Sequence, residues 1–161
     1  MGILLNDNDI LELVRERKVL PEGYTTLFQM KEKKGHKEQE VTIKRNDGSL
    51  FKVILRQSIR DILDFSVILG YMPPKSSVLF RLTRYNGRHK HTNKIENVSF
   101  YDFHIHLATQ RYQEAGYDED AYAQASNIYS DIRGAMECLI KDCNIILPED
   151  ILIQKISARR V

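Results

Sequence analysis

The segment EVTIKRNDGSLFKVILR, residues 40–56, carries the clearest structural signal in this chain. Apolar residues alternate with polar ones on both sides of its centre: Val41, Ile43, Phe51, Val53 and Leu55. A period of two is typical of a β-strand with one buried face. Between the two runs, Asp47 and Gly48 supply the positive φ values of a tight turn. The segment therefore predicts an antiparallel β-hairpin.

Further strands are predicted on the C-terminal side of this hairpin. Residues 64–71 (DFSVILGY) and 77–85 (SVLFRLTRY) are rich in β-branched and aromatic residues, and Pro73 lies in a stiff turn between them. Residues 100–106 (FYDFHIH) predict a fifth strand. Together these segments predict an antiparallel meander of four to five strands.

Helical signals lie on both sides of the meander. Asn6 is a good N-cap, and the helix that it starts is predicted to end at Pro21. After the meander the apolar period changes to 3.6, which predicts a short helix in 108–116 and a longer one in 128–140. The tail, 146–161, is either a last strand or a loosely held terminus. The predicted fold class is α+β, with C-terminal helices packed on one face of the sheet.

Composition limits the protein class. With 161 residues, 42% of them hydrophobic and 29% charged, the chain predicts a single globular domain over residues 1–161. No apolar run approaches the roughly 20 residues that span a bilayer. The N-terminus lacks the basic and apolar regions of a secretory signal, so we expect a cytoplasmic protein with no membrane partner. The cysteines, Cys138 and Cys143, are expected to be free thiols, in agreement with that compartment.

Residues 81–106 hold four of the five histidines, in two His-x-His pairs. If residues 100–106 are extended, His104 and His106 share a face with Asp102, and Phe103 and Ile105 face the core. The histidines would then meet whatever lies beside the sheet. A single site requires that the two pairs lie within about 10 Å of each other, because direct hydrogen-bond reach is much shorter.

Three interpretations of this segment remain open. Four imidazoles can bind Zn²⁺, with Asp102 completing or orienting the site. Alternatively, histidine acid and base with arginine on the phosphate can cleave RNA without metal, using its 2′-OH as nucleophile. The third interpretation is a basic surface without catalysis that binds nucleic acid or another anion. Few clustered carboxylates occur outside Asp118-Glu119-Asp120, which argues against a Mg²⁺-dependent nuclease.

The metal-independent interpretation leads to a definite set of residues, with no metal ligand and no cofactor. The expected acid and base groups are His89, His91, His104 and His106. The expected phosphate- or nucleic-acid-binding residues are Arg81, Arg84, Arg88, Lys90, Asn86, Tyr85 and Tyr112. Of these, Tyr85 and Tyr112 are expected to stack on a base or donate a proton. The acidic run 118–120 is interpreted as the solvated start of a helix.

The order of these motifs resembles that of known proteins. Residues 84–93, RYNGRHKHTN, followed by His104-Ile105-His106, resemble a group of uncharacterised small bacterial proteins with the pattern RYxGxHxHTN…HIH. More distantly, residues 40–112 are similar to TumE-like toxins of toxin–antitoxin pairs. The resemblance implies a bacterial toxin- or defence-related enzyme acting on RNA or a nucleotide, with an antitoxin as partner. One departure is that twelve residues separate the two histidine pairs here. An exposed edge strand would also allow a homodimer.

Overall fold

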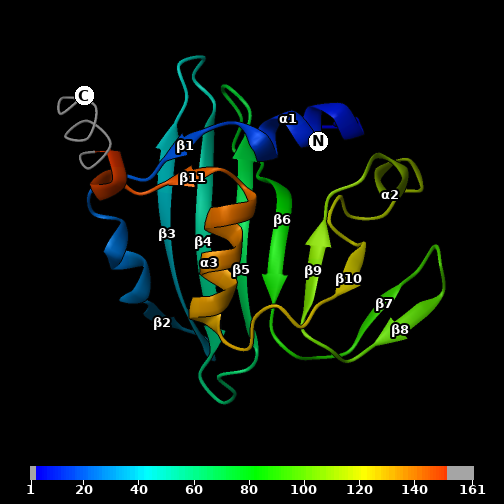
Figure 1. Ribbon diagram of the computed structural model, residues 1–161. Coiled ribbons are helices and arrows are strands. Elements are labelled where there is room, and N and C mark those ends of the chain that lie inside the picture. Colours follow the sequence, from blue (N-terminus) through cyan, green and yellow to red (C-terminus); the bar gives the residue numbers. More distant parts are fainter. Residues whose placement is uncertain (1–2, 152–161) are drawn as a thin grey trace, which may run out of the picture.

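A seven-stranded antiparallel sheet forms the body of the protein, in the order β10-β9-β6-β5-β4-β3-β2 (Figure 1). Its strands are β2 (Lys31–Lys33), β3 (His36–Lys44), β4 (Leu50–Ser58), β5 (Phe65–Met72), β6 (Phe80–Asn86), β9 (His104–Leu107) and β10 (Ala123–Ala125). The computed structural model describes residues 3–151. The predicted α+β class is confirmed, and the sheet gains short edge strands beyond the predicted meander.

The hairpin of β3 and β4 forms as predicted. Val41 lies opposite Val53, and the pairing continues to Lys44 opposite Leu50. The Arg45 backbone N–H donates to the Ser49 carbonyl oxygen at 3.0 Å and closes the loop. Within that loop only Gly48 has a positive φ, of 88°, a conformation that glycine adopts at little cost, so the expectation of a positive φ at Asp47 is wrong.

The strands after the hairpin are confirmed in part. β5 and β6 form as predicted, but the segment 100–106 is not one strand. Its start belongs to β8 (Val98–Phe100), which pairs with β7 (His91–Asn93) in a separate two-stranded sheet. Its end is β9, which joins the main sheet beside β6. The chain turns between them, so β7 and β8 form a separate hairpin at the β10 end of the sheet (Figure 1).

Within residues 3–151, the helices that lie wholly in the described part of the chain are α1 (Asp7–Arg15), the 3-10 helix η1 (Tyr24–Phe28), α2 (Gln110–Glu114) and α3 (Ile132–Asp142). The first begins at the predicted N-cap Asn6, whose side chain accepts from the Asp9 N–H. It ends earlier than predicted, because β1 (Lys18–Val19) pairs in parallel with β11 (Ile145–Ile146). The predicted tail, 146–161, contributes only Ile146 to a strand, and residues 148–151 are helical, which the sequence did not predict. Residues 152–161 of that tail lie outside the described residues.

One face of the sheet is covered by α3, which crosses β4 and β5 in Figure 1. Its buried residues, Ala135, Met136 and Leu139, join the apolar side chains of the sheet in one core. The helix begins after the N-cap Asp131 rather than at the predicted Ile128, which is 61% exposed. Cys138 and Cys143 are free, as expected.

The opposite face of the sheet is polar. The strand register places Arg56, Ser66, Asn86 and His104 in one row across four strands, because each residue pairs with the next. Residues in register on neighbouring strands share a face. The register therefore brings part of the histidine segment to this polar face, where the candidate site lies.

Candidate metal centre

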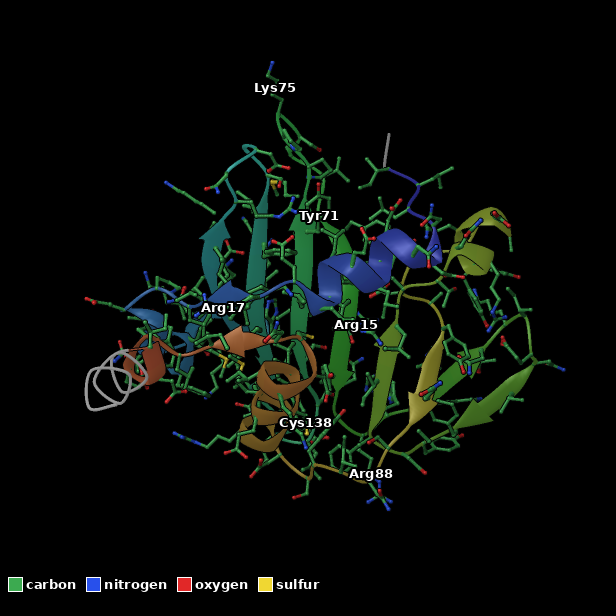
Figure 2. The ribbon with its side chains drawn as sticks, turned by 45° about the horizontal axis from the view of Figure 1, so that its top comes forward. Arg15, Arg17, Tyr71, Lys75, Arg88 and Cys138 are labelled. Atoms are coloured by element: carbon green, nitrogen blue, oxygen red, sulfur yellow. The ribbon has the colours of Figure 1, made fainter. Side chains whose placement is uncertain are left out.

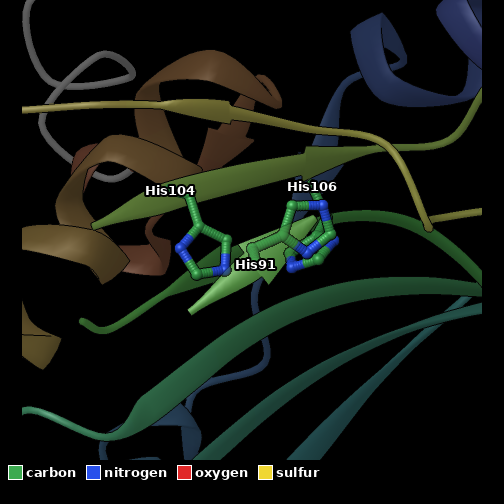
Figure 3. A group of neighbouring side chains, drawn as sticks. All are labelled: His91, His104 and His106. Atoms are coloured by element: carbon green, nitrogen blue, oxygen red, sulfur yellow. The ribbon is translucent and has the colours of Figure 1, made fainter. Parts of the chain in front are cut away.

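Three histidines from two strands come together on the polar face of the sheet. His104 and His106 project from β9, and His91 projects from β7 (Figure 3). The ring centroids lie 5.3 Å apart for His91 and His104, 4.8 Å for His91 and His106, and 5.0 Å for His104 and His106. The three can each offer a ring nitrogen so that all the nitrogens lie within 4.8 Å of one another. His91 of the first pair and both histidines of the second thus form a single cluster, well within the distance that a single site requires.

The cluster is more buried than expected. Phe103 and Ile105 pack against the core, so the predicted facing of β9 is confirmed. His104 and His106, however, are only 0% and 3% exposed. His91 on the β7–β8 hairpin lies against both rings, and this long-range contact could not be foreseen from the spacing of the histidines.

Each of the three rings donates one N–H to a fixed oxygen. The Nδ1 of His104 donates to the Asp102 carbonyl oxygen at 2.8 Å, and the Nδ1 of His106 donates to the Asp120 carbonyl oxygen at 2.7 Å. The Nε2 of His91 donates to the Asn93 Oδ1 at 2.8 Å. A neutral imidazole that donates from one nitrogen carries a lone pair on the other. Metal-binding histidines are oriented in this way.

The amide of Asn93 has a fixed orientation, which decides the direction of the His91 bond. Its Nδ2 donates to the Ala123 carbonyl oxygen at 2.8 Å, and its Oδ1 accepts from the Ala123 N–H at 2.9 Å. The Oδ1 therefore faces His91 as an acceptor. Asn93 is buried and ties β7 to β10, so it both holds the hairpin in place and sets the tautomer of His91.

The lone pairs of the two β9 histidines differ in their surroundings. The Nε2 of His104 is buried and has no hydrogen-bond partner among residues 3–151. The Nε2 of His106 accepts from the Asn86 Nδ2 at 3.2 Å and lies 3.4 Å from the Arg84 Nη2. An ion bound at His106 would take the place of both donors, the Asn86 amide and the Arg84 guanidinium.

Burial keeps both β9 histidines neutral. It lowers the pKa of His104 to about 4. Burial, together with the nearby Arg84 guanidinium, lowers the pKa of His106 to about 2. Both rings are therefore uncharged near pH 7, which is the form that binds a metal ion.

His89 stands beside the cluster rather than within it. Its ring is edge-on to His104 at 4.8 Å, and its side chain is 43% exposed. Its Nδ1 lies 3.9 Å from the Asp64 Oδ1. The preceding turn is fixed by Gly87, whose N–H donates to the Phe65 carbonyl oxygen, and a Cβ there would lie 1.8 Å from the Leu63 carbonyl oxygen.

Two of the expected phosphate-binding arginines are paired with acidic residues. Asp120 is buried, and its carboxylate lies 3.3 Å from Arg81 and 3.5 Å from Arg84. Arg81 and Arg84 are three residues apart, so in a regular strand they would point to opposite faces. The register of the β5–β6 pair shifts between Leu69 and Gly70, and this irregularity lets both arginines reach Asp120. The prediction of a solvated helix start at 118–120 is wrong, since no helix begins there and Asp120 is an internal ion-pair partner.

The other expected binding residues are divided between surface and core. Lys90 and Arg88 are exposed, and Figure 2 shows Arg88 pointing outward at the edge of the molecule. Asn86 is buried in the cluster. The expectation that Tyr85 and Tyr112 stack on a base is wrong, because they are 3% and 0% exposed. Tyr85 is directed into the core and donates to Asp142, and Tyr112 donates to Glu96.

Two residues that hydrogen-bond to the histidine cluster, Asn93 and Asp120, were not predicted from the sequence. Asn93 follows His91 by two positions, so it shares a face with that histidine in an extended strand, and this spacing was an available signal. Asp120 had no such signal, because its arginine partners lie on β6, far earlier in the chain. Asp102 does orient His104, but it does so with its backbone oxygen.

Comparisons with protein-family models, with curated proteins and with solved structures found no match. The resemblance to TumE-like toxins and to the small bacterial proteins therefore stays a prediction. Within residues 3–151, no helix is both long and apolar enough to cross a membrane. What the geometry defines is an α+β protein with a three-histidine cluster, in which His104 and His106 are buried and His91 is half-buried.

Proposed function

We propose that His91, His104 and His106 bind a transition-metal ion, with Zn²⁺ the best fit to three neutral imidazoles. The observation that carries this proposal is the Nε2 of His104, a buried acceptor without a partner among the described residues that belongs to the cluster of three rings. Leaving such a group unpaired costs about 1–3 kcal/mol. A bound cation would satisfy it, and the fixed Nδ1 bonds hold the rings ready.

Three protein ligands leave one coordination position for water or substrate, as in zinc enzymes. Metal-bound water has a pKa near 7 and is a strong nucleophile. Outside the three ligands, His89 is open to solvent and next to Asp64, so it is placed to exchange protons with solvent. The arrangement suits hydrolysis, and Arg84 next to His106 suits an anionic substrate.

The biological proposal follows the sequence resemblance. We propose a cytoplasmic bacterial protein, toxin- or defence-related, that cleaves a phosphodiester in RNA or a nucleotide. An antitoxin partner and a homodimer are part of that proposal.

A second candidate is cleavage without metal, with Arg84 on the phosphate and the histidines as acid and base. It is favoured by the 3.4 Å approach of Arg84 to His106. It is weakened by the neutral state of His104 and His106, since neither ring can donate a proton as an imidazolium near pH 7. A binding module without catalysis would use the same basic residues to bind an anion but would not cleave it.

Metal analysis of protein purified without a histidine tag tests the proposal. We expect about one zinc ion per chain by plasma mass spectrometry after exposure to zinc and gel filtration. We expect the chelator EDTA to abolish any cleavage of a fluorogenic RNA or of bis(p-nitrophenyl) phosphate, and zinc to restore it. Cleavage by metal-free protein that EDTA does not change would support the second candidate and contradict the first.

A further inference from the structure

Two grooves lie on either side of the histidine cluster. The first, which we call the Arg56 groove, has a volume of about 380 Å³, and its basic and polar lining includes Lys34, His36, Arg56, Ser66, Arg84 and His89. The second, which we call the Lys90 groove, has a volume of about 580 Å³, and its lining includes Arg81, Arg84, Lys90, His91, Lys94 and Tyr117.

The two grooves share one lining residue, which lies beside the cluster. Arg84 lines both, and it lies 3.4 Å from the Nε2 of His106. Asn86 and His89 line the Arg56 groove, whereas His91 and His106 line the Lys90 groove. A ligand lying along both grooves would therefore pass Arg84 and the side of the cluster that His91 and His106 present to the Lys90 groove.

Basic side chains outnumber acidic ones in both grooves; Asp64 is the acidic lining residue of the Arg56 groove, and its Oδ1 lies 3.9 Å from the His89 Nδ1. Among residues 3–151, neither Lys90 nor Lys94 has a carboxylate within 4.0 Å, and the same is true of Lys34. The acidic residues of the Lys90 groove, Asp118 and Asp120, face the arginines instead. Each groove thus contains lysine side chains that have no carboxylate of the described residues at short range. Such lysines can pair with a phosphate.

The Lys90 groove also offers an aromatic ring. Tyr117 is 38% exposed, and the Lys94 Nζ lies 5.6 Å from its ring centroid. An exposed ring beside lysines is the combination that binds a base together with its phosphate. Tyr117 is exposed enough to stack on a base, whereas Tyr85 and Tyr112 are buried.

We infer that the two grooves bind one single-stranded polynucleotide, with phosphates in both grooves and a base against Tyr117. An internal phosphate then faces the metal centre, so cleavage would occur within the chain rather than at its end. This inference rests on the proposed metal site for its chemistry, but strand binding can be measured separately.

The test is fluorescence anisotropy of the full chain with fluorescein-labelled oligouridines of 2, 4, 8 and 12 nucleotides. One double variant, K34Q with R56Q, removes charge from the Arg56 groove. The other, K90Q with K94Q, removes charge from the Lys90 groove. A matched control, K44Q with K75Q, removes two charges at the other end of the sheet; Lys75 and Arg88 mark the opposite ends in Figure 2.

We expect each groove variant to bind the 12-mer about tenfold more weakly, and the control to bind like wild type. The negative slope of log affinity against log salt should become shallower by about 0.7 for each phosphate that the variant no longer neutralises. Tyr117→Leu should weaken binding at least fivefold, with recovery in Tyr117→Phe. Affinity in wild type should rise with length until the strand fills both grooves.

Wild-type affinity in either groove variant would overturn the inference, as would equal losses of affinity in the control. A heparin oligosaccharide is a polyanion without bases. If it binds as tightly as the 12-mer, and Tyr117→Leu does not change its affinity, the grooves bind polyanions in general and the inference is overturned. The zinc content of each variant separates the two proposals, because none of these residues is a proposed ligand. If the wild-type protein binds one zinc ion per chain but does not bind the oligouridines, only this inference is overturned. Strand binding without zinc overturns the metal centre alone.

Discussion

The Nδ1 of His104 lies 2.8 Å from the carbonyl oxygen of Asp102, two residues earlier in the chain. Because this bond uses the only N–H of the neutral ring, the lone pair is placed on Nε2, which is buried without a partner among residues 3–151. A backbone oxygen thus prepares the ring for a ligand. The same arrangement at His106, with the Asp120 carbonyl oxygen, favours a metal centre over a group of packed side chains.

Replacement of Asn93 tests how His91 is oriented. Asn93→Ala removes the acceptor of His91 and both bonds to Ala123, so we expect the free energy of unfolding to fall by about 2 kcal/mol. Zinc affinity should fall about 10–100-fold, as is usual when a partner of a metal-binding histidine is removed. Urea denaturation and zinc titration measure the two effects. Thr92→Ala, on the half-buried opposite face of the same hairpin, removes one hydrogen bond to Ser99 and none to His91, so it should leave zinc affinity unchanged. Equal losses of zinc affinity in both variants would contradict the proposed role.

Replacement of Asp120 tests the ion pairs beside the cluster. Asp120→Asn leaves Arg84 and Arg81 without their buried counter-charge, so we expect a loss of about 2 kcal/mol in the free energy of unfolding. The carbonyl oxygen that holds His106 is retained, so zinc should still bind. The control is Asp118→Asn, since Asp118 is 79% exposed and 3.9 Å from Arg81. If the two variants are equally stable in urea, the buried ion pairs do not stabilise the fold as we describe.

Lys18 provides a test of the fold far from the cluster. Its Nζ donates to the carbonyl oxygens of Val14, Glu16 and Cys143 at 2.8–2.9 Å. Burial lowers the pKa of Lys18 to about 8, so the group is still charged at pH 7. Lys18→Met leaves these oxygens without their donor, and we expect the free energy of unfolding to fall by about 2 kcal/mol. Thermal denaturation should show the loss, while Lys44→Met on the surface of β3 should unfold like wild type.

Local patterns in the sequence predicted the strands better than the ends of the helices. The hairpin of residues 40–56 was predictable because alternation and turn chemistry act within a few residues. The early end of α1 was not, because it depends on the parallel pairing of Lys18 with Ile145, far along the chain. The division of residues 100–106 between two sheets likewise depends on pairing with β7 and β6.

For the site, spacing predicted which histidines could share a face but not how they are buried. The facing of His104 and His106 follows from the period of a strand. The burial that makes them neutral comes from the β7–β8 hairpin and from Asp120, which are placed by tertiary contacts. The spacing of the histidines alone is therefore compatible with metal-free acid–base chemistry, whereas the two buried, neutral rings support the proposed metal ion.

The most direct test of the metal centre is zinc titration of tag-free protein by isothermal calorimetry, comparing wild type with His104→Ala and His36→Ala. His36 lies on β3 outside the cluster, so its variant controls for the loss of one histidine. We predict one zinc site per chain in wild type and in His36→Ala, and at least a hundredfold weaker binding in His104→Ala. Circular dichroism should confirm that all three proteins are folded. Folded wild-type protein that binds no zinc, or His104→Ala protein that binds it as tightly as wild type, would contradict the account.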